Sequence, residues 1–512
     1  MTAANQKSSY GQILKSSSIM GGAAGINLLL GMIRIKFVAV LIGTTGVGLL
    51  ASFTALQGII GTIAGLGIQS SAVREVAAAV GKGDAQAIGR AVLTLRRVCW
   101  LTGLVGMAAM MAFSPMLSQL TFGSDQYRLD IAALGIVILL ANISGGQMAL
   151  IQGMRRIGDM ARANVFGAIF ATLAAIGFYS WLGVRGIVPA LVSIGAMQLA
   201  LSWYFARRLP VPKVSLSWRQ TYTEAGGMVR LGLVFMWNGL MGSLVSYITV
   251  TLISQKIGLH AVGIYSAAFA LSGMFVGFVL SAMGADYYPR LTAVAHDKAA
   301  MNRLVNEQTE IGLLLAMPGL LATLALAPWI VHIFYTSEFL PAVKLLQWFV
   351  IGCLGRVISW PLGFVILALG KGRWFLLTES AFNILHLVLI AAGLLLFGIE
   401  GVAIGFFVMY VGYAVAVYRV GHHLIGFKWS AECIKIASFA LVLLGVTLIA
   451  ARALPLWPAT IFGSVLTAAV SIVSLRGLVQ RIGQDHRMFR LMAKLPGFKA
   501  LCGTQNAPTH PA

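Results

Sequence analysis

Hydrophobic residues in this chain form long, nearly continuous stretches that are separated by short polar segments. A helix that crosses a bilayer needs about 20 mostly apolar residues, and fourteen stretches come close to that length. They lie near 13–40, 46–72, 98–115, 130–153, 164–183, 187–206, 231–254, 260–285, 309–335, 340–369, 375–397, 400–418, 434–451 and 458–475. The pattern predicts an all-α polytopic membrane protein with about fourteen transmembrane helices.

The composition excludes a soluble protein. Of the 512 residues, 59% are hydrophobic and only 10% are charged, which leaves too few charges for a water-exposed surface. Glycine is abundant, with 58 residues, as expected where helices pack closely in lipid. The composition therefore supports the membrane class.

The basic residues are unevenly distributed between the two sets of loops. If the N-terminus is cytoplasmic, 29 of the 37 lysines and arginines lie in cytoplasmic loops and tails, 5 lie in the opposite loops and 3 lie inside spans. Because cytoplasmic loops carry such an excess, we expect both termini in the cytoplasm. The formal net charge of +22 then reflects topology and contact with anionic lipids, not nucleic acid.

Two distant segments of the sequence are similar at one constant offset. Residues 42–58 read IGTTGVGLLASFTALQG and residues 257–273 read IGLHAVGIYSAAFALSG, an offset of 215 that recurs between GVRG at 183–186 and GIEG at 398–401. The chain crosses the membrane six times between the copies, so both copies run in the same direction. Parallel repeats are typical of transporters in which one lobe rocks against the other.

This repeat sets the predicted domain organisation, which is two parallel six-helix lobes and a C-terminal extension. The predicted parts are an N-terminal lobe at 1–207, a cytoplasmic linker at 208–230, a C-terminal lobe at 231–425, an extra helix pair at 434–475 and a basic cytoplasmic tail at 476–512.

Three basic residues lie inside predicted spans, where charges are costly and mark functional sites. Arg356 is close to the middle of its span, five residues before Pro361; it either faces a substrate or binds backbone carbonyls at a proline bend. Arg34 and Lys36 share the first span but point about 200° apart around a helix. We expect Arg34 to face the lumen, whereas Lys36 either joins it or extends to water at the outer end.

A second group of candidates lies at the predicted cytoplasmic ends of the two lobes. Arg74 and Arg290 are nearly equivalent in the repeat, so they are candidates for binding an anionic headgroup, although the topology alone also accounts for Arg74. Asp286 precedes Arg290 by four residues, which favours an ion pair. That pair is either a gate latch or a local salt bridge.

Two glutamates are candidates for ion coupling or gating. Glu379 lies near the start of the eleventh span, where the helix dipole also favours an acid, and Asn383 and His386 follow it on one face. Glu310 lies at the entrance to the ninth span, where it is either solvated or buried. A buried carboxylate has a raised pKa and is able to carry a coupling proton.

The sequence gives no sign of an enzyme. It contains no G-x-S-x-G, H-E-x-x-H or GxxxxGK[ST] motif and no acidic metal-binding pair. Its four cysteines, Cys99, Cys353, Cys433 and Cys502, are far apart, so we predict no disulfide framework and no zinc site. We expect neither a cofactor nor a metal.

Several segments resemble Wzx-type O-antigen flippases, which belong to the multidrug/oligosaccharidyl-lipid/polysaccharide (MOP) superfamily. They are IGTTGVGLLASFTALQ, GLGIQSSAVREVA, YSAAFALSGMFVGFVLSAMGADYYPRLTAV, VNEQTEIGLLLAMPG and GRWFLLTESAFN, which lie between residues 42 and 383, and the resemblance covers residues 10 to about 425. LLGMIR also resembles the cation-bearing first helix of lipid II flippases, and the match falls at Arg34. The two extra C-terminal spans resemble the fourteen-helix architecture of the same flippases. The second span, with IIGTIAGLG at its middle, lacks the arginine of those relatives.

The resemblance implies a MATE-like fold that moves an undecaprenyl-diphosphate-linked oligosaccharide from the cytoplasmic to the periplasmic leaflet of a bacterial inner membrane by alternating access. On this basis we expect the diphosphate to dock on Arg34 and Arg356, with Arg290 at the inner mouth. A polysaccharide polymerase and a chain-length regulator are the expected protein partners.

Two alternatives remain. A MATE-like ion-coupled multidrug exporter needs acidic residues in its cavity, against which Arg34 and Arg356 argue. A membrane glycosyltransferase or polymerase of the same pathway needs larger outer loops than this chain has.

Overall fold

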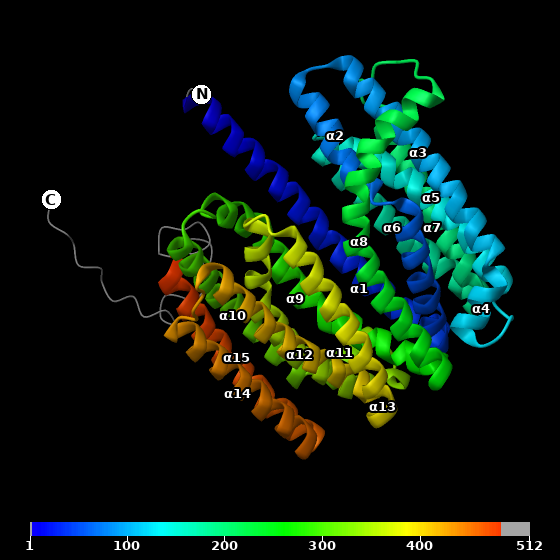
Figure 1. The fold of residues 1–512 in the computed structure, drawn as a ribbon. Helices are drawn as coiled ribbons and strands as arrows, with labels where there is room; N and C mark the ends of the chain where they lie inside the picture. Colours follow the sequence, from blue (N-terminus) through cyan, green and yellow to red (C-terminus); the bar gives the residue numbers. More distant parts are fainter. Residues whose placement is uncertain (1–2, 483–512) are drawn as a thin grey trace. The chain divides into compact units, whose positions relative to one another are not determined.

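The computed structural model describes the backbone of residues 3–482 and their side chains except for residues 3–19, Ala282 and Ala285. Most of the predicted basic tail at 476–512 therefore lies outside the described residues. All regular structure in the described part is helical (Figure 1). The elements are α1 Ala3–Gly65, α2 Ile68–Lys82, α3 Ala85–Ala112, α4 Ser114–Phe122, α5 Arg128–Gly153, α6 Ile157–Leu182, η1 Gly183–Gly186, α7 Ile187–Ala206, α8 Trp218–Lys256, α9 Leu259–Ala293, α10 Lys298–Ala325, α11 Ala327–Phe334, η2 Ser337–Phe339, α12 Ala342–Ala368, α13 Gly372–Ile425, α14 Ala431–Ala453 and α15 Leu456–Ile482.

Eleven helical stretches in the described residues are long and apolar enough to cross a membrane. Three of them, of 46, 50 and 54 residues, are too long for one crossing. Each is interrupted by a glycine with positive φ: Gly43 in α1, Gly183 after α6 and Gly398 in α13. Dividing these three stretches at their glycines gives fourteen segments, so the predicted all-α membrane class and the approximate number of crossings are confirmed.

The sequence repeat corresponds to a repeat of backbone geometry. Gly43 (φ 62°) and Gly258 (φ 117°) are 215 residues apart, and so are Gly183 (φ 56°) and Gly398 (φ 62°). Residues other than glycine rarely adopt these φ values. The glycines shared by the two copies are therefore the points at which the chain changes direction between helices.

The chain divides into two compact units, each of which is described by itself. Within the described residues, unit 1 comprises residues 3–266 and Ile333–Phe339, and unit 2 comprises Ala267–His332 and residues 340–482. These units are defined by which helices pack together, whereas the predicted lobes were defined by the sequence repeat. The lobe boundaries therefore stay a prediction.

In unit 1, helices α3, α5 and α7 pack in a row, while α6 and α8 pack against α1 (Figure 1). The two copies of the repeat contact each other here. A Cβ atom built on Gly48 would lie 1.9 Å from the Leu259 carbonyl oxygen, and one on Gly263 would lie 2.0 Å from the Thr44 carbonyl oxygen. Gly48 and Gly263 are themselves 215 residues apart. Only glycine allows this approach of two backbones.

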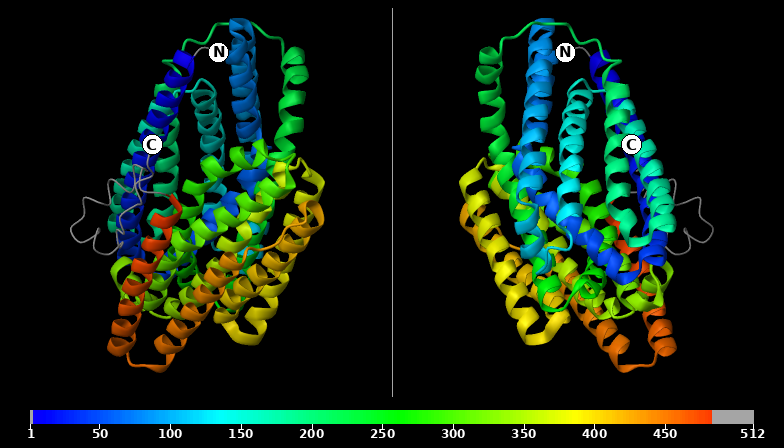
Figure 2. Two further views of the ribbon diagram at one scale, coloured as in Figure 1. Left: turned by 90° about the vertical axis from the view of Figure 1, so that its left-hand side faces the viewer. Right: turned by 90° about the vertical axis from the view of Figure 1, so that its right-hand side faces the viewer.

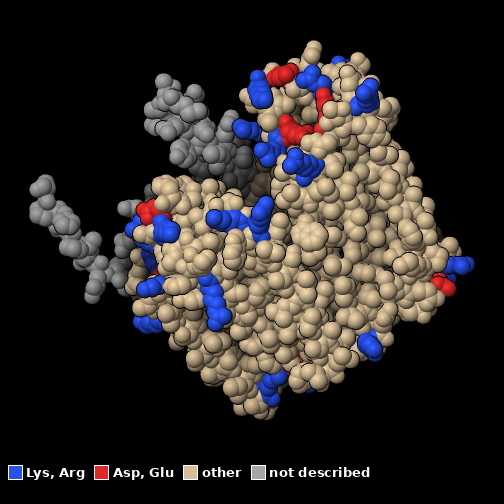
Figure 3. All heavy atoms as spheres, viewed as in Figure 1, with Lys and Arg blue, Asp and Glu red and all other residues tan. Residues whose placement is uncertain are grey.

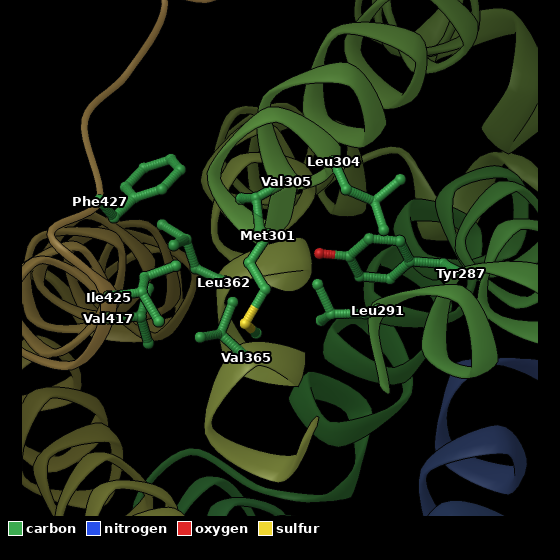
Figure 4. Close-up of a cluster of buried hydrophobic side chains, with 10 residues drawn as sticks. All are labelled: Tyr287, Leu291, Met301, Leu304, Val305, Leu362, Val365, Val417, Ile425 and Phe427. Carbon is green, nitrogen blue, oxygen red and sulfur yellow. The ribbon is translucent and has the colours of Figure 1, made fainter. Parts of the chain in front are cut away.

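In unit 2, α12 packs against α13, and α10 packs against α12, α14 and α15. A buried cluster at one end of this bundle includes Tyr287 and Leu291 of α9, Met301 and Val305 of α10 and Leu362 of α12 (Figure 4). The Tyr287 hydroxyl donates to the Pro361 carbonyl oxygen at 2.9 Å. This hydrogen bond satisfies a polar group where water is scarce and fixes the end of α9.

Candidate functional site

A chain of polar groups crosses the interface between α12 and α13 in unit 2. Tyr413 donates its hydroxyl to Glu379 Oε1 at 2.6 Å, and the rings of Tyr410 and Tyr413 lie 6.3 Å apart. Tyr410 lies within electrostatic reach of both Arg356 and Glu379. The structure thus places two candidates from different predicted spans on either side of one tyrosine pair.

The absence of a side chain at Gly355 brings this group together. A Cβ atom on Gly355 would lie only 3.1 Å from Tyr410 Cβ and 3.4 Å from the Tyr410 carbonyl carbon. The next residue of α12 is Arg356, which therefore leaves the helix close to α13. A side chain at Gly355 would press on Tyr410, which would have to shift by a few tenths of an ångström to accommodate it.

Arg356 itself is half-buried in a membrane-spanning helix. Its charge also acts on the neighbouring Cys353. Among the described residues, no carboxylate pairs with its guanidinium and no carbonyl accepts a hydrogen bond from it. The alternative in which Arg356 binds backbone carbonyls at a bend near Pro361 therefore gains no support. An unpaired cation at this depth is costly and is suited to an anionic ligand.

The polar face that the sequence predicted on α13 is present. Asn383 Nδ2 donates to the Glu379 carbonyl oxygen at 2.7 Å, and the His386 ring lies 5.9 Å from the Phe406 ring. Asn383 is therefore bound to its own helix, and His386 packs against an aromatic ring. Glu379 is the member of this face that reaches a second membrane-spanning segment.

The predicted pair of Asp286 and Arg290 is confirmed as an ion pair. The Arg290 Nη1 atom lies 3.3 Å from Asp286 Oδ2, and both side chains are exposed. Tyr287 and Leu291, which alternate with them on α9, are fully buried. Because an exposed pair contributes at most about 1 kcal/mol, the buried neighbours position this part of α9. A gating role for the pair stays a prediction.

Glu310 lies in a contact between α10 and the last two helices. Its carboxylate accepts hydrogen bonds from Arg481 Nε at 3.0 Å and from the Ser430 hydroxyl at 2.9 Å. Only 14% of the Glu310 side chain is exposed. Arg481 also approaches Glu432 at 3.4 Å. These contacts tie α14 and α15 to α10, while ion coupling through Glu310 stays a prediction.

In unit 1, the structure places Arg34 and Lys36 in different surroundings. Arg34 is half-buried and close enough to Tyr179 of α6 to act on it electrostatically. Lys36 donates to the Tyr335 carbonyl oxygen, which belongs to the segment Ile333–Phe339 that packs in unit 1. Arg34 thus remains the candidate within the span, and Lys36 joins this segment to α1.

Arg74 is exposed on α2, close to a cavity with acidic and basic side chains in its lining, which the sequence did not predict. The cavity has a volume of about 420 Å³, and Glu75, Arg90 and Glu224 contribute to its lining. Arg90 Nε approaches Glu224 at 3.5 Å. Burial, and then the negative charge of Glu224, raises the pKa of Glu75, against the opposing effect of Arg74. Glu224 was not selected from the sequence, because it lies within the predicted linker. An acid in this otherwise basic region could have marked it as a candidate.

A second cavity of unit 1 is polar but uncharged. It has a volume of about 350 Å³ and is lined by side-chain amides and hydroxyls, by glycines of α1 and by apolar side chains such as Ile138 and Phe235. Its lining includes Gln57, Thr62, Gln69, Ser70 and Asn142. Amides and hydroxyls both donate and accept hydrogen bonds, which suits a ligand rich in hydroxyl groups.

Comparisons with known proteins identify the family and the fold of this chain. A family model described as polysaccharide biosynthesis protein matches residues 37–344, more than half of the chain. The lipid III flippases of Escherichia coli (strain K12) and Shigella flexneri are each 24% identical to it over 375 residues, which is 70% of this chain and 86% of theirs.

Two solved structures show the same fold. Lipid II flippase MurJ in an inward closed conformation aligns with a TM-score of 0.68 at 11% identity, covering 92% of this chain and 99% of that chain. An inward-facing multidrug resistance MATE family transporter aligns with a TM-score of 0.66 at 15% identity, covering 78% and 94%.

These findings define a multi-pass membrane protein with the fold of the MOP superfamily, as the sequence predicted. The chain belongs to the polysaccharide biosynthesis protein family.

Proposed function

We propose that this protein is a flippase that moves an undecaprenyl-diphosphate-linked oligosaccharide, such as an O-antigen repeat unit, from the cytoplasmic to the periplasmic leaflet by alternating access. Family membership and the similarity to lipid III flippases support a lipid-linked precursor as the cargo. The excess of basic residues in one set of loops supports cytoplasmic termini. A polysaccharide polymerase and a chain-length regulator complete the proposed pathway as partners.

The observation that carries this proposal is the half-buried Arg356, which has no acidic partner among the described residues. A diphosphate that enters a membrane needs compensating positive charge, because low dielectric strengthens charge interactions and penalises unpaired charges. Arginine provides this charge with several directed hydrogen bonds. Arg34 provides a second cation inside a span of unit 1, and Arg290, Arg74 and Lys36 are further proposed contacts.

The sugars and the coupling ion have separate candidate groups. We assign the oligosaccharide to polar, uncharged surfaces such as the amide- and glycine-lined cavity of unit 1. Glu379 is the proposed coupling carboxylate, because proton binding there would weaken its hydrogen bond from Tyr413 next to Arg356. Asp286 and Glu310 are the remaining proposed gating residues.

Flipping by reconstituted Arg356→Gln protein tests this assignment. We expect the rate of glycan exposure to fall roughly 10- to 100-fold, the loss expected when charged hydrogen bonds to a phosphate disappear. Arg356→Lys should retain part of the activity. The matched control is Arg373→Gln, which removes an exposed arginine of the same unit. A fully active and normally inserted Arg356→Gln protein would refute the role of Arg356.

A further inference from the structure

Unit 1 contains a large cleft formed by α3, α5, α7 and the segment between α7 and α8. Its volume is about 860 Å³, near the upper end of the range of about 300–1,000 Å³ for small-molecule sites. The segment 208–217 crosses the end of α3 (Figure 2). A Cβ atom on Gly89 would lie 2.8 Å from the Pro212 carbonyl oxygen, so this segment lies directly on the helix.

Three basic side chains line the cleft: Arg96 of α3, Arg207 at the end of α7 and Lys213 of the crossing segment. All three residues are exposed, and no acidic residue lines the cleft. Basic and acidic residues gather together at the end of unit 1 that carries α2, α3 and the start of α8, above a broad uncharged flank (Figure 3). The cleft therefore provides positive charge next to a membrane-facing surface.

Two neighbouring arginines make contacts outside the cleft, whereas Arg207 lies over the ring of Trp203, which lines the cleft, at 4.5 Å. Arg97 donates to the Leu216 carbonyl oxygen at 3.0 Å and to the Thr221 hydroxyl at 2.6 Å, so it joins α3 to the crossing segment and to the start of α8. Arg208 lies over the Tyr204 ring at 4.0 Å. Neither arginine lines the cleft.

The rest of the cleft is mainly apolar. Its walls include Leu93, Trp100, Leu199 and Trp203, and the two tryptophans are about half exposed, at 51% and 53%. Tryptophan is enriched at the level of lipid headgroups. The amide of Gln147 is the uncharged polar side chain of the lining, and its oxygen already accepts the Ser202 hydroxyl at 2.8 Å.

We propose that this cleft binds one anionic phospholipid of the surrounding bilayer. Arg96, Arg207 and Lys213 hold the phosphate, and the acyl chains lie along the apolar walls of α3 and α7. Gln147 brings the one uncharged amide among the lining residues, which offers few acceptors for the many hydroxyl groups of a glycan. A lipid bound here would also hold the crossing segment against α3 and α7. This proposal does not depend on which substrate the protein flips.

The test measures lipid binding to the purified full-length protein in a neutral detergent. A phosphatidylglycerol that carries a photoreactive group in an acyl chain should label peptides of α3 and α7, and phosphatidylglycerol should raise the Tm more than phosphatidylcholine does. Replacing Arg96, Arg207 and Lys213 together by glutamine should weaken binding roughly 100-fold, given the contribution expected of each basic residue to anionic-lipid binding.

Two further variants keep the test specific. The matched control replaces Arg208, Arg219 and Arg230 by glutamine, which removes equal charge from unit 1 outside the cleft and should leave binding unchanged. Ala196→Trp fills the cleft without changing its charge and should also reduce labelling.

Three results would overturn the proposal. They are equal labelling of both triple variants, stabilisation by inorganic phosphate alone as large as that by phosphatidylglycerol, and displacement of phosphatidylglycerol by an equal concentration of polyprenyl-diphosphate oligosaccharide. The second result would indicate a simple anion site, and the third a substrate site. Loss of flipping by Arg356→Gln with unchanged lipid labelling would support both proposals separately.

Discussion

Two carboxylates, Glu75 of α2 and Glu224 of α8, line the same cavity of unit 1. Burial and the charge of Glu224 raise the pKa of Glu75 from its ordinary value of 4.5, because both disfavour the ionised form. The protonated form therefore stabilises the folded state at low pH. This stabilisation is lost as the pH rises from about 4.5 through the raised pKa.

We therefore predict that Glu75→Gln has a flatter dependence of Tm on pH than the wild type. The variant should be more stable than the wild type above the raised pKa, since it no longer buries a negative charge beside Glu224. Thermal unfolding in detergent from about pH 5 to about pH 8 would measure this difference. Parallel Tm profiles for the two proteins would show that Glu75 is not the responsible group.

The side-chain group around Arg356 also shows what the sequence was able to predict. A charge in the middle of an apolar stretch is visible in the sequence, and so is Glu379 near the start of another. Their shared electrostatic interaction with Tyr410 was not visible, because it depends on how closely α12 and α13 pack at Gly355. The periodicity of the sequence shows which residues share one face of a helix, but it does not show which helix packs against that face.

At the scale of the helix, close glycine contacts bring backbones together alongside a core of large apolar residues. Gly48→Ala should destabilise unit 1 by about 1–3 kcal/mol, because the new methyl group would collide with the Leu259 carbonyl group. The control is Gly31→Ala, since a Cβ atom there meets nothing within 4 Å and alanine favours the helix. The Tm and the yield of folded protein measure the effect. Equal Tm values for the two variants would contradict the packing seen here.

The helix pair at the C-terminus gives a second prediction at this scale. Arg481→Gln should loosen α14 and α15 by about 1–3 kcal/mol, because the carboxylate of Glu310 would lose its charged partner in a largely buried site. Limited proteolysis should then cleave near these helices sooner. Arg290→Gln breaks an exposed pair and should change stability by less than about 1 kcal/mol.

Glu310→Gln separates the structural role from the predicted coupling role. If Glu310 is only a structural tie, Glu310→Gln and Arg481→Gln should both be less stable, with flipping unchanged once folded. Normal stability combined with loss of gradient-dependent flipping in Glu310→Gln alone would favour coupling.

Capping residues and glycines predict where helices begin and end more accurately than hydropathy alone. The predicted linker at 208–230 gives way to helix at Trp218, because Ser217 and Gln220 form a reciprocal capping box that starts α8 well before its apolar stretch. The breaks at Gly43, Gly183 and Gly398 were more readily predicted, since each separates two apolar stretches. Glu224 was missed because the apolar pattern alone set the helix start.

For the whole molecule, the repeat is the most informative feature of the sequence. A constant offset of 215 residues predicted two similar halves, and glycines at that spacing share unusual backbone angles. The offset also predicted transport, since parallel repeats suit a rocking carrier. The cleft of unit 1 was beyond prediction, because its cations come from segments far apart in the sequence that only folding brings together.

The most direct test of the central claim is flipping by the purified protein in liposomes. A labelled undecaprenyl-diphosphate oligosaccharide would be placed in the inner leaflet, and an impermeant probe would report glycan exposure with and without an ion gradient or a membrane potential. We predict exposure that requires the protein and responds to at least one of these driving forces. No exposure with several matched glycans, together with gradient-driven movement of cationic dyes, would contradict the account and indicate a drug exporter.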